Sequence, residues 1–405
     1  MNVLMISPGF PDEMPLFTEG LAAAGAQVLG IGEQPEQALP PRARRALSAY
    51  QRIDSYWDEE ALIGEVRQLA SRVAIERVEC LWEPGILIAA RLRAALGLPG
   101  MTPAQSLLFR DKERMKQALD VAGVRTPRHA RATSEQECRE AAERIGYPLI
   151  LKPIAGAGSA DTHRVGGAGD LDRALAAVKH VRELSVEEFI DGDEYTFDTI
   201  CADGRICYYN VSWYRPRPLI GRTVQWISPQ TLSLRDPDQQ RLAPGVEMGR
   251  AVLDALGFRS GFTHMEWFLT SSGEAVFGEI AARPPGARSV DLMNYSCDID
   301  TYRGWAETVC RGGFSQPVAR RHNAAVIFKR AQGSGRIRHI AGLERLVARY
   351  RAHLVCVDLL PPGAPRRNWK QTLLSDGFVI LRHPDLQATM EMADRVGTDL
   401  QIYAE

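Results

Sequence analysis

The stretch FGEIAARPPGAR, residues 277–288, carries charged side chains inside a strand-like apolar segment. Glu279 has apolar neighbours on both sides, and Arg283 follows four residues later, directly before two prolines. Side chains alternate between the two faces of a strand, so Glu279, Ala281 and Arg283 are predicted to share one face. A guanidinium at that place is suited to brace a transferring phosphoryl group or an oxyanion.

A second strand just upstream carries a matching carboxylate. In THMEWFL, residues 263–269, the period of two puts His264 and Glu266 on one face. A Ser-Gly turn at 272–273 makes the two strands antiparallel neighbours, and this places Glu266 beside Glu279. Two adjacent carboxylates repel unless a positive charge lies between them. Mg²⁺ prefers oxygen ligands and keeps positions open for phosphate oxygens. The alternative is a surface hairpin with salt-bridged glutamates, which the apolar surroundings disfavour.

A glycine-bearing segment, PLILKPIAGAGSADT, residues 148–162, is the third feature. A buried strand delivers Lys152, and a loop with Gly156, Gly158 and Ser159 follows. Glycines let backbone N–H groups approach phosphate oxygens, and a lysine adds a point charge. No Gly-Lys-Ser/Thr follows, so the loop is not a Walker A motif. A flexible surface loop explains the pattern equally well.

The fourth feature is VEEFIDGDEYTFD, residues 186–198, in which a strand end is followed by an Asp-Gly turn. Backbone donors and acceptors between apolar side chains, around Glu187, Glu188 and Ile190, suit an adenine ring. Glu194, a few residues later, is placed to take ribose hydroxyls. Taken alone, this segment fits a solvated charged turn better.

Composition and charge exclude several classes of protein. The chain has 405 residues, 45% hydrophobic and 24% charged, with a formal net charge of −1. Neither nucleic acid nor a membrane is therefore an expected partner. Seven scattered cysteines without a CxxC pair indicate reduced thiols. With no bilayer-spanning run and no signal peptide, a cytoplasmic location is expected.

The order of predicted elements suggests three parts. Residues 1–100 alternate short strands and helices, as in a Rossmann-like parallel sheet. They include a predicted helix at 62–75 and a predicted strand at 78–82. A helix at 111–122 carries Lys112 in its first turn, and a capping box starts another helix at Ser134. From about residue 319, strands at 324–328, 354–360 and 378–382 precede a final helix at 386–396.

These pieces together resemble the ATP-grasp superfamily, over about residues 111–286. The match consists of the lysine in DKERMKQAL, Lys152 with its loop, the VEEFIDGDEYTFD segment, and the paired glutamate strands with Arg283. The tail is similar to carboxylate–amine ligases, including L-amino-acid ligases. The resemblance implies an α/β and α+β ATP-grasp fold. Its parts would be an N-terminal domain (1–100), an ATP-grasp domain (101–318) with a mobile lid (about 125–190), and a C-terminal subdomain (319–405).

The resemblance also implies roles for single residues. Lys112 and Lys152 would bind ATP phosphates under a loop from Gly156 to Ser159, and Glu266 and Glu279 would ligate Mg²⁺, for which Mn²⁺ is a possible substitute. The remaining roles are adenine binding by Glu187, Glu188 and Ile190, ribose binding by Glu194, support of the acyl-phosphate step by Arg283, and substrate contacts by Arg288 and Glu83.

The implied enzyme is an ATP-dependent carboxylate–amine ligase that joins small substrates, amino acids above all, through an acyl phosphate. His264 would act on the proton of the amine, or else serve in packing. A relative that activates bicarbonate or formate is one alternative. Ala281 stands where many members have an asparagine metal ligand, so a nucleotide-binding protein without turnover is another. A homodimer is common among look-alikes.

Residues 208–228 are aromatic and basic and lack a clean strand period. Arg215 and Trp226 would line a pocket for the acceptor substrate. A dimer contact or a core position would explain the same residues.

Overall fold

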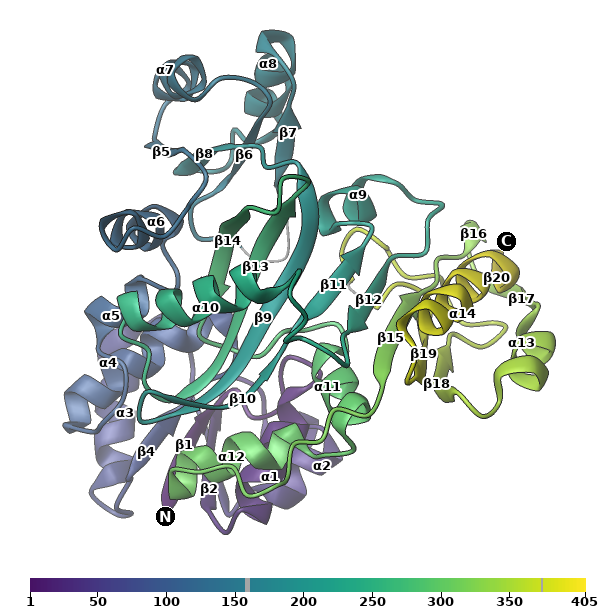
Figure 1. Ribbon diagram of the computed structural model, residues 1–405. Helices are drawn as coiled ribbons and strands as arrows, with labels where there is room; N and C mark the ends of the chain where they lie inside the picture. The colour runs from purple at the N-terminus through teal and green to yellow at the C-terminus, as the bar shows by residue number, and fades with distance from the viewer. Residues whose placement is uncertain (157–160, 373) are drawn as a thin grey trace.

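The computed structural model describes residues 1–156, 161–372 and 374–405. Its strands form four sheets, which Figure 1 shows grouped around a long central one. Helices and strands are mixed throughout, as the predicted α/β and α+β class requires. In the part of the chain that the structure describes, no helix has both the length and the apolar character of a membrane span.

The N-terminal sheet is parallel, with the strand order β3-β2-β1-β4. Hydrophobic residues are buried on both faces of this sheet, as expected for a parallel sheet covered by helices. The elements are β1 (Asn2–Ile6), α1 (Met14–Ala23), β2 (Gln27–Gly32), α2 (Pro41–Ala46), β3 (Ala49–Arg52), α3 (Glu59–Ala70), β4 (Arg77–Glu79), α4 (Ile86–Leu96) and α5 (Pro103–Leu107).

A small antiparallel sheet, with the order β5-β8-β6-β7, stands above the central sheet in Figure 1. Two helices pack on it and close a separate apolar core. The elements are α6 (Lys112–Val121), β5 (His129–Ala132), α7 (Glu135–Ile145), β6 (Leu149–Pro153), β7 (His163–Val165), α8 (Ala168–Ala177) and β8 (Leu184–Glu188).

The central sheet has nine strands in the order β14-β13-β9-β11-β12-β15-β19-β18, with β10 beside β9. The strands are β9 (Gly192–Ala202), β10 (Arg205–Asn210), β11 (Ser212–Arg215), β12 (Gln230–Ser233), β13 (Gly261–Thr270), β14 (Ala275–Ala281), β15 (Asn323–Phe328), β18 (Leu354–Leu359) and β19 (Gly377–His383). The helices are α9 (Pro218–Thr223), α10 (Ala243–Ala255), α11 (Ser289–Cys297), α12 (Thr301–Arg311), α13 (Leu343–Tyr350) and α14 (Leu386–Asp399). A three-stranded sheet, with β16 (Gln332–Gly333), β17 (Ile337–Ala341) and β20 (Gln401–Ala404), completes the C-terminal part.

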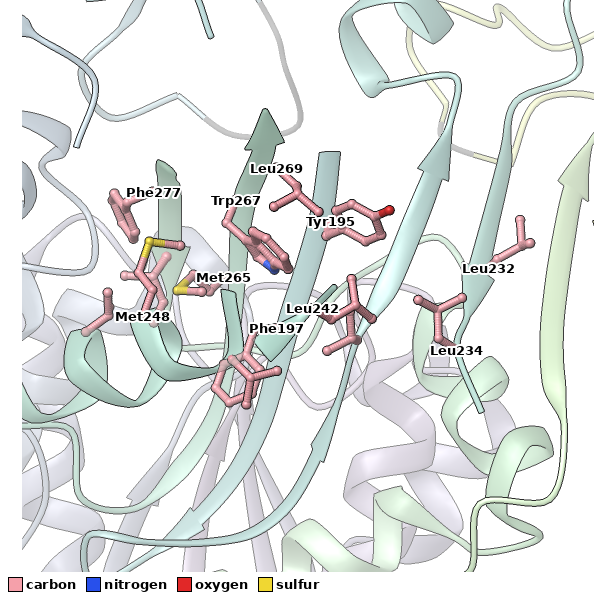
Figure 2. Close-up of a cluster of buried hydrophobic side chains, with 14 of the residues drawn as sticks. Tyr195, Phe197, Leu232, Leu234, Leu242, Met248, Met265, Trp267, Leu269 and Phe277 are labelled. Carbon is pink, nitrogen blue, oxygen red and sulfur yellow. The ribbon is translucent and has the colours of Figure 1, made fainter. Parts of the chain in front are cut away.

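The two faces of β13 differ, and the difference follows the period of two along the strand. Met265, Trp267 and Leu269 belong to the large hydrophobic cluster that Figure 2 shows. The intervening His264 and Glu266 line a cavity on the other face. The alternation predicted for this strand is therefore confirmed.

Helix α10 covers the apolar face of the central sheet at close range. A Cβ on Gly245 would meet the Trp267 ring at 2.2 Å, and a Cβ on Gly249 would meet the Phe197 ring at 2.3 Å. Glycine at these two positions lets the large aromatic rings pack directly against the helix backbone. This packing fixes β9 and β13, and with them the side chains on the opposite face.

Some boundaries differ from those expected from the sequence. The helix expected at 62–75 begins at Glu59, because the Asp58 carboxylate accepts the Ala61 N–H at 3.1 Å and caps its first turn. It ends at Ala70. The strand expected at 78–82 ends at Glu79, and Glu83–Gly85 form a 3₁₀ turn that leads into α4.

Candidate active site

A cavity of about 660 Å³ is enclosed by all the larger parts of the molecule. The loops after β1 and β4 contribute Phe10 and Trp82, at the carboxyl ends of parallel strands, where ligands commonly bind. The small antiparallel sheet contributes Lys152, the central sheet contributes Glu266, and the C-terminal part contributes Trp369. The cavity thus gathers side chains that are far apart in the sequence.

Glu266 and Glu279 stand opposite each other on β13 and β14, and their predicted pairing is confirmed. The register shifts directly after this pair, so that Trp267 pairs with Phe277 and Gly278 is the extra residue of a bulge. A Cβ on Gly278 would come within 2.7 Å of the Glu266 carbonyl oxygen. Glycine at this position therefore allows the two strands to approach where the carboxylates meet.

Three lysines surround the second glutamate. Lys112 Nζ lies 3.3 Å from Glu279 Oε2, and Lys152 Nζ lies 3.8 Å from the same oxygen and 3.0 Å from Glu187 Oε2. Burial alone would raise the pKa of Glu279, but Lys112, Lys152 and Lys116 outweigh it and lower that pKa to about 2. Burial would lower the pKa of Lys152, and its two glutamates reverse that shift. These groups are therefore ionised at neutral pH.

Lys116 is a member of this cluster that the sequence analysis missed. Its side chain is fully buried, and its Nζ lies 2.8 Å from Glu187 Oε1. The Ser185 hydroxyl donates to the same oxygen at 2.7 Å. Burial would raise the pKa of Glu187, yet Lys116 and Lys152 hold it below its usual value. The spacing could have indicated this role, because Lys116 follows Lys112 by one helical turn and so lies on the same face of the helix.

His264 lies between two carboxylates. Its Nδ1 is 2.6 Å from Asp198 Oδ1, and its Nε2 is 3.5 Å from Glu266 Oε1. Burial alone would lower the pKa of His264, but hydrogen bonds to Asp198 and Glu266 raise it to about 9. A ring that is protonated at neutral pH donates to both carboxylates and holds Glu266 in place, as does the Tyr214 hydroxyl at 3.3 Å. Before it could take a proton from an amine, this ring would have to lose one.

Arg283 is anchored to the N-terminal sheet through Glu83. The Arg283 Nε donates to Glu83 Oε2 at 2.8 Å, and Arg110 binds the other carboxylate oxygen. Burial would lower the pKa of Arg283, and Glu83 reverses that shift. Glu83 therefore holds Arg283 on the cavity wall, beside Glu266 and Glu279. A direct contact between Glu83 and a substrate stays a prediction.

The residues expected around adenine and ribose lie on the cavity wall as well. Both Glu187 oxygens are taken by the lysines, and the Ile190 carbonyl accepts from Arg217 at 3.0 Å. The Glu188 carboxylate binds Arg125 at 3.3 Å. Burial, with Glu266 adding to it, raises the pKa of Glu194 well above its usual value.

The expected phosphate loop is described only in part. The Gly156 carbonyl accepts from Lys112 Nζ at 2.7 Å, which ties the start of the loop to the lysine cluster. Gly158 and Ser159 lie outside the described residues.

Three substrate-side candidates are not among the described residues that line this cavity. Arg288 binds Asp291 at 3.3 Å. Arg215 binds Asp394 at 3.2 Å and borders a separate hollow. Trp226 is 85% exposed. Their contact with a substrate stays a prediction.

The chemistry of the wall fits a nucleotide with its magnesium ion. Lysines at 112 and 152 can exchange glutamate for phosphate oxygens, and Glu266 with Glu279 supplies two carboxylates on one face. Within residues 1–156, 161–372 and 374–405, no group of three or more acidic, His or Cys side chains is arranged to hold a metal. An ion held here would take its other oxygens from phosphate and water, which suits Mg²⁺. Ala281 is buried opposite His264 and offers no further ligand.

Part of this wall lies in a segment that matches a known family. Residues 117–294 match the model of the ATP-grasp domain. The chain contains an ATP-grasp domain. This segment includes Lys152, Glu187, both paired glutamates and Arg283.

Solved structures confirm the ATP-grasp fold over the whole chain. An L-amino acid ligase from Bacillus licheniformis superposes with a TM-score of 0.81 at 22% identity, covering 100% of this chain and 99% of that one. The N5-carboxyaminoimidazole ribonucleotide synthetase from Thermotoga maritima reaches 0.73 at 17% identity, with the same coverage. At these identities the likeness concerns the fold alone.

Two curated relatives are similar in sequence beyond the ATP-grasp domain. An L-arginine-specific L-amino acid ligase of Bacillus subtilis is 26% identical over an alignment of 283 residues, which covers 63% of this chain and 68% of the relative. An alanine–anticapsin ligase of Bacillus subtilis is 28% identical over an alignment of 301 residues, which covers 66% of this chain and 62% of the relative. The alignments thus span about two thirds of these relatives.

Proposed function

We propose that this protein is an ATP-dependent carboxylate–amine ligase that joins amino acids or similar small molecules. The observation that carries the proposal is the in-register pair Glu266 and Glu279, facing Lys112 and Lys152 in one cavity with Arg283. Support comes from the ATP-grasp domain and from relatives that are named as an L-amino acid ligase and an alanine–anticapsin ligase.

The proposed reaction has two steps that need no protein nucleophile. A carboxylate oxygen of one substrate takes the terminal phosphoryl group of ATP, and ADP leaves. The amine nitrogen of the second substrate then forms a bond to the carbonyl carbon, phosphate leaves, and the nitrogen loses one proton. Most of the rate enhancement in such phosphoryl transfers comes from positioning and electrostatics.

The residues of the cavity would share this work. Lys112 and Lys152 would hold phosphate oxygens, and Arg283, fixed by Glu83, would face the oxygen on which charge develops. Mg²⁺, when bound by Glu266 and Glu279, would supply charge neutralisation. His264 would keep Glu266 oriented, a positioning role that its bond to Asp198 supports.

The test is release of phosphate and ADP from ATP–Mg²⁺, with the twenty amino acids offered singly and in pairs, for the wild type and for Glu279→Gln. Release that needs a particular pair, with a product mass equal to the sum of the two minus water, would support the proposal. Release that needs bicarbonate and no amino acid would point to the carboxylating alternative.

A second candidate function is nucleotide binding without turnover, and Ala281 is the observation that favours it. Its signature would be bound ATP with no phosphate released under any pair. In that case Ala281→Asn, which restores a ligand oxygen, is expected to bring back turnover.

A further inference from the structure

We propose that Arg222 and Arg330 form a binding site for a substrate carboxylate that the reaction leaves intact. The inference rests on the proposed ligase function and adds to it the chemical class of one substrate. Both arginines line the same cavity as the paired glutamates, although they are far apart in the chain.

Contacts to backbone carbonyl groups fix both side chains. Arg330 Nη1 donates to the Val224 carbonyl and Nη2 to the Gly221 carbonyl, each at 2.7 Å. Its guanidinium plane lies over the Trp369 ring, 4.4 Å from the centroid. Arg222, in α9, donates to the Lys370 carbonyl at 3.0 Å. These bonds orient the two guanidinium groups and involve no carboxylate.

Other arginines in this part of the molecule differ from these two because they form ion pairs with carboxylates. Arg215 pairs with Asp394 at 3.2 Å, and Arg366 pairs with Asp376 at 3.6 Å. Over the described portion of the chain, neither Arg222 nor Arg330 has a carboxylate in ion-pair contact. Two like charges that face one cavity and lack an acid favour an anion between them.

The titration of these groups points the same way. Burial lowers the pKa of Arg330 to about 10, and the nearby Arg222 adds to that shift. Asp376 opposes it, but this carboxylate is already engaged by Arg366. Burial also lowers the pKa of Arg222. An incoming carboxylate would relieve both effects.

The reaction itself identifies the anion. Joining two amino acids consumes one carboxylate and one amine, and the carboxylate of the amine substrate stays free. Phosphate oxygens are accounted for by Lys112 and Lys152 and the activated carboxylate by Arg283, so a free carboxylate remains for the arginine pair. A planar carboxylate matches the guanidinium fork. The second source of the same chemistry is a side-chain carboxylate on the acyl substrate.

The test is equilibrium binding and does not need turnover. Each amino acid and its carboxamide would be titrated into the wild type, Arg222→Gln and Arg338→Gln in the presence of Mg²⁺ and a non-hydrolysable ATP analogue. Binding would be measured as the shift in melting temperature. Arg338 is an exposed arginine on β17 outside the cavity. The best-binding free acid is expected to bind about tenfold more tightly than its amide. This preference should persist in Arg338→Gln and fall below about twofold in Arg222→Gln.

Equal binding of acid and amide to the wild type would overturn the site, and so would a preference that survives in Arg222→Gln. Arg222→Lys keeps the charge and checks the fold, because it should retain part of the preference. If the Arg222-dependent difference instead separates Glu from Gln and Asp from Asn, the carboxylate belongs to the side chain of the acyl substrate. Phosphate release from an amino-acid pair without any Arg222-dependent preference would refute this site and leave the ligase function standing.

Discussion

Two parts of the cavity wall differ in the partners of their positively charged side chains. In the lysine–glutamate cluster, formed by Lys112, Lys116, Lys152, Glu187 and Glu279, every lysine has a glutamate oxygen within 3.3 Å. In the arginine pair, Arg222 and Arg330, both side chains are bonded to backbone carbonyl groups. In the first region every lysine already has a carboxylate partner before any ligand arrives. In the second region the arginines are only oriented.

This difference separates two ways of building an anion site. In the cluster, an arriving phosphate must replace a glutamate partner, so part of the attraction is offset by the broken ion pairs. In the arginine pair no ion-paired carboxylate has to be displaced, so less of the attraction to a ligand is offset. The cluster should therefore govern stability and turnover, and the pair should govern the affinity for one substrate.

The largest effect should come from the deepest lysine of the cluster. Lys116→Met removes a fully buried charge that is paired with Glu187. Breaking a buried ion pair by removing one partner costs about 3–5 kcal/mol of unfolding free energy. Urea unfolding would measure the loss, with the exposed Lys179→Met as the matched control. A loss below about 1 kcal/mol would show that the cluster does not hold these elements together.

The next effect concerns turnover. Glu279→Gln removes one of the two paired carboxylates and should lower ADP release by about two to three orders of magnitude, the range found when one electrostatic contact to a transition state is lost. Glu274→Gln is the control, since Glu274 precedes the same strand but is exposed and pairs with Arg125. Equal activity of the two variants would show that the paired glutamates are not needed for catalysis.

The bulge beneath this pair offers a smaller, structural test. Gly278→Ala would press a Cβ to 2.7 Å from the Glu266 carbonyl, and strain of this kind costs about 1–3 kcal/mol. Gly64→Ala is the opposite control, because a Cβ there in α3 meets nothing within 4 Å. That change should stabilise the protein by about 0.5–1 kcal/mol. Calorimetric melting of both variants would distinguish steric crowding at position 278 from a destabilising effect of glycine-to-alanine substitution in general.

The pKa of His264 predicts a pH dependence of stability. Because this pKa is about 9 in the folded protein and about 6.5 when unfolded, the folded state binds the extra proton. The stabilisation is complete below pH 6.5 and is lost as the pH rises through 9. In His264→Gln that decline should be absent between pH 6.5 and 9, measured as the urea midpoint. The exposed His339→Gln should keep it.

The smallest effect is expected outside the cavity. Trp226→Ala removes a side chain that is 85% exposed, so stability should change by less than about 0.5 kcal/mol. Substrate affinity should stay the same, in contrast to Arg222→Gln. A rise in KM would instead support the prediction from the sequence that Trp226 lines the substrate pocket.

Local periodicity was enough to predict much of the ATP-grasp domain. The turn at 272–273 and the period of two placed Glu266 beside Glu279, and the register agrees. Lys152 and Arg283 followed from short motifs at the ends of strands. In each case the chemistry lies within a few residues of the signal that orients it.

The remainder of the site depends on contacts between distant segments. Arg330 follows β15 and binds the carbonyl groups of Gly221 and Val224, in and directly after α9, which brings it near Arg222. No local sequence pattern predicts that contact. The same holds for Asp198, whose partner His264 lies on a neighbouring strand. In the aromatic segment, Arg215 and Trp226 were the more conspicuous residues, yet neither lines the described cavity wall.

The most direct test of the contrast between the two regions is a pair of kinetic profiles. With the amino-acid pair that supports ADP release, kcat and KM would be measured for the wild type, Glu279→Gln and Arg222→Gln. We predict that Glu279→Gln lowers kcat for every amine substrate. Arg222→Gln should raise the KM of the amine substrate about tenfold or more, with kcat within about threefold of the wild type. The same change in both variants, or a loss of kcat alone in Arg222→Gln, would contradict the account.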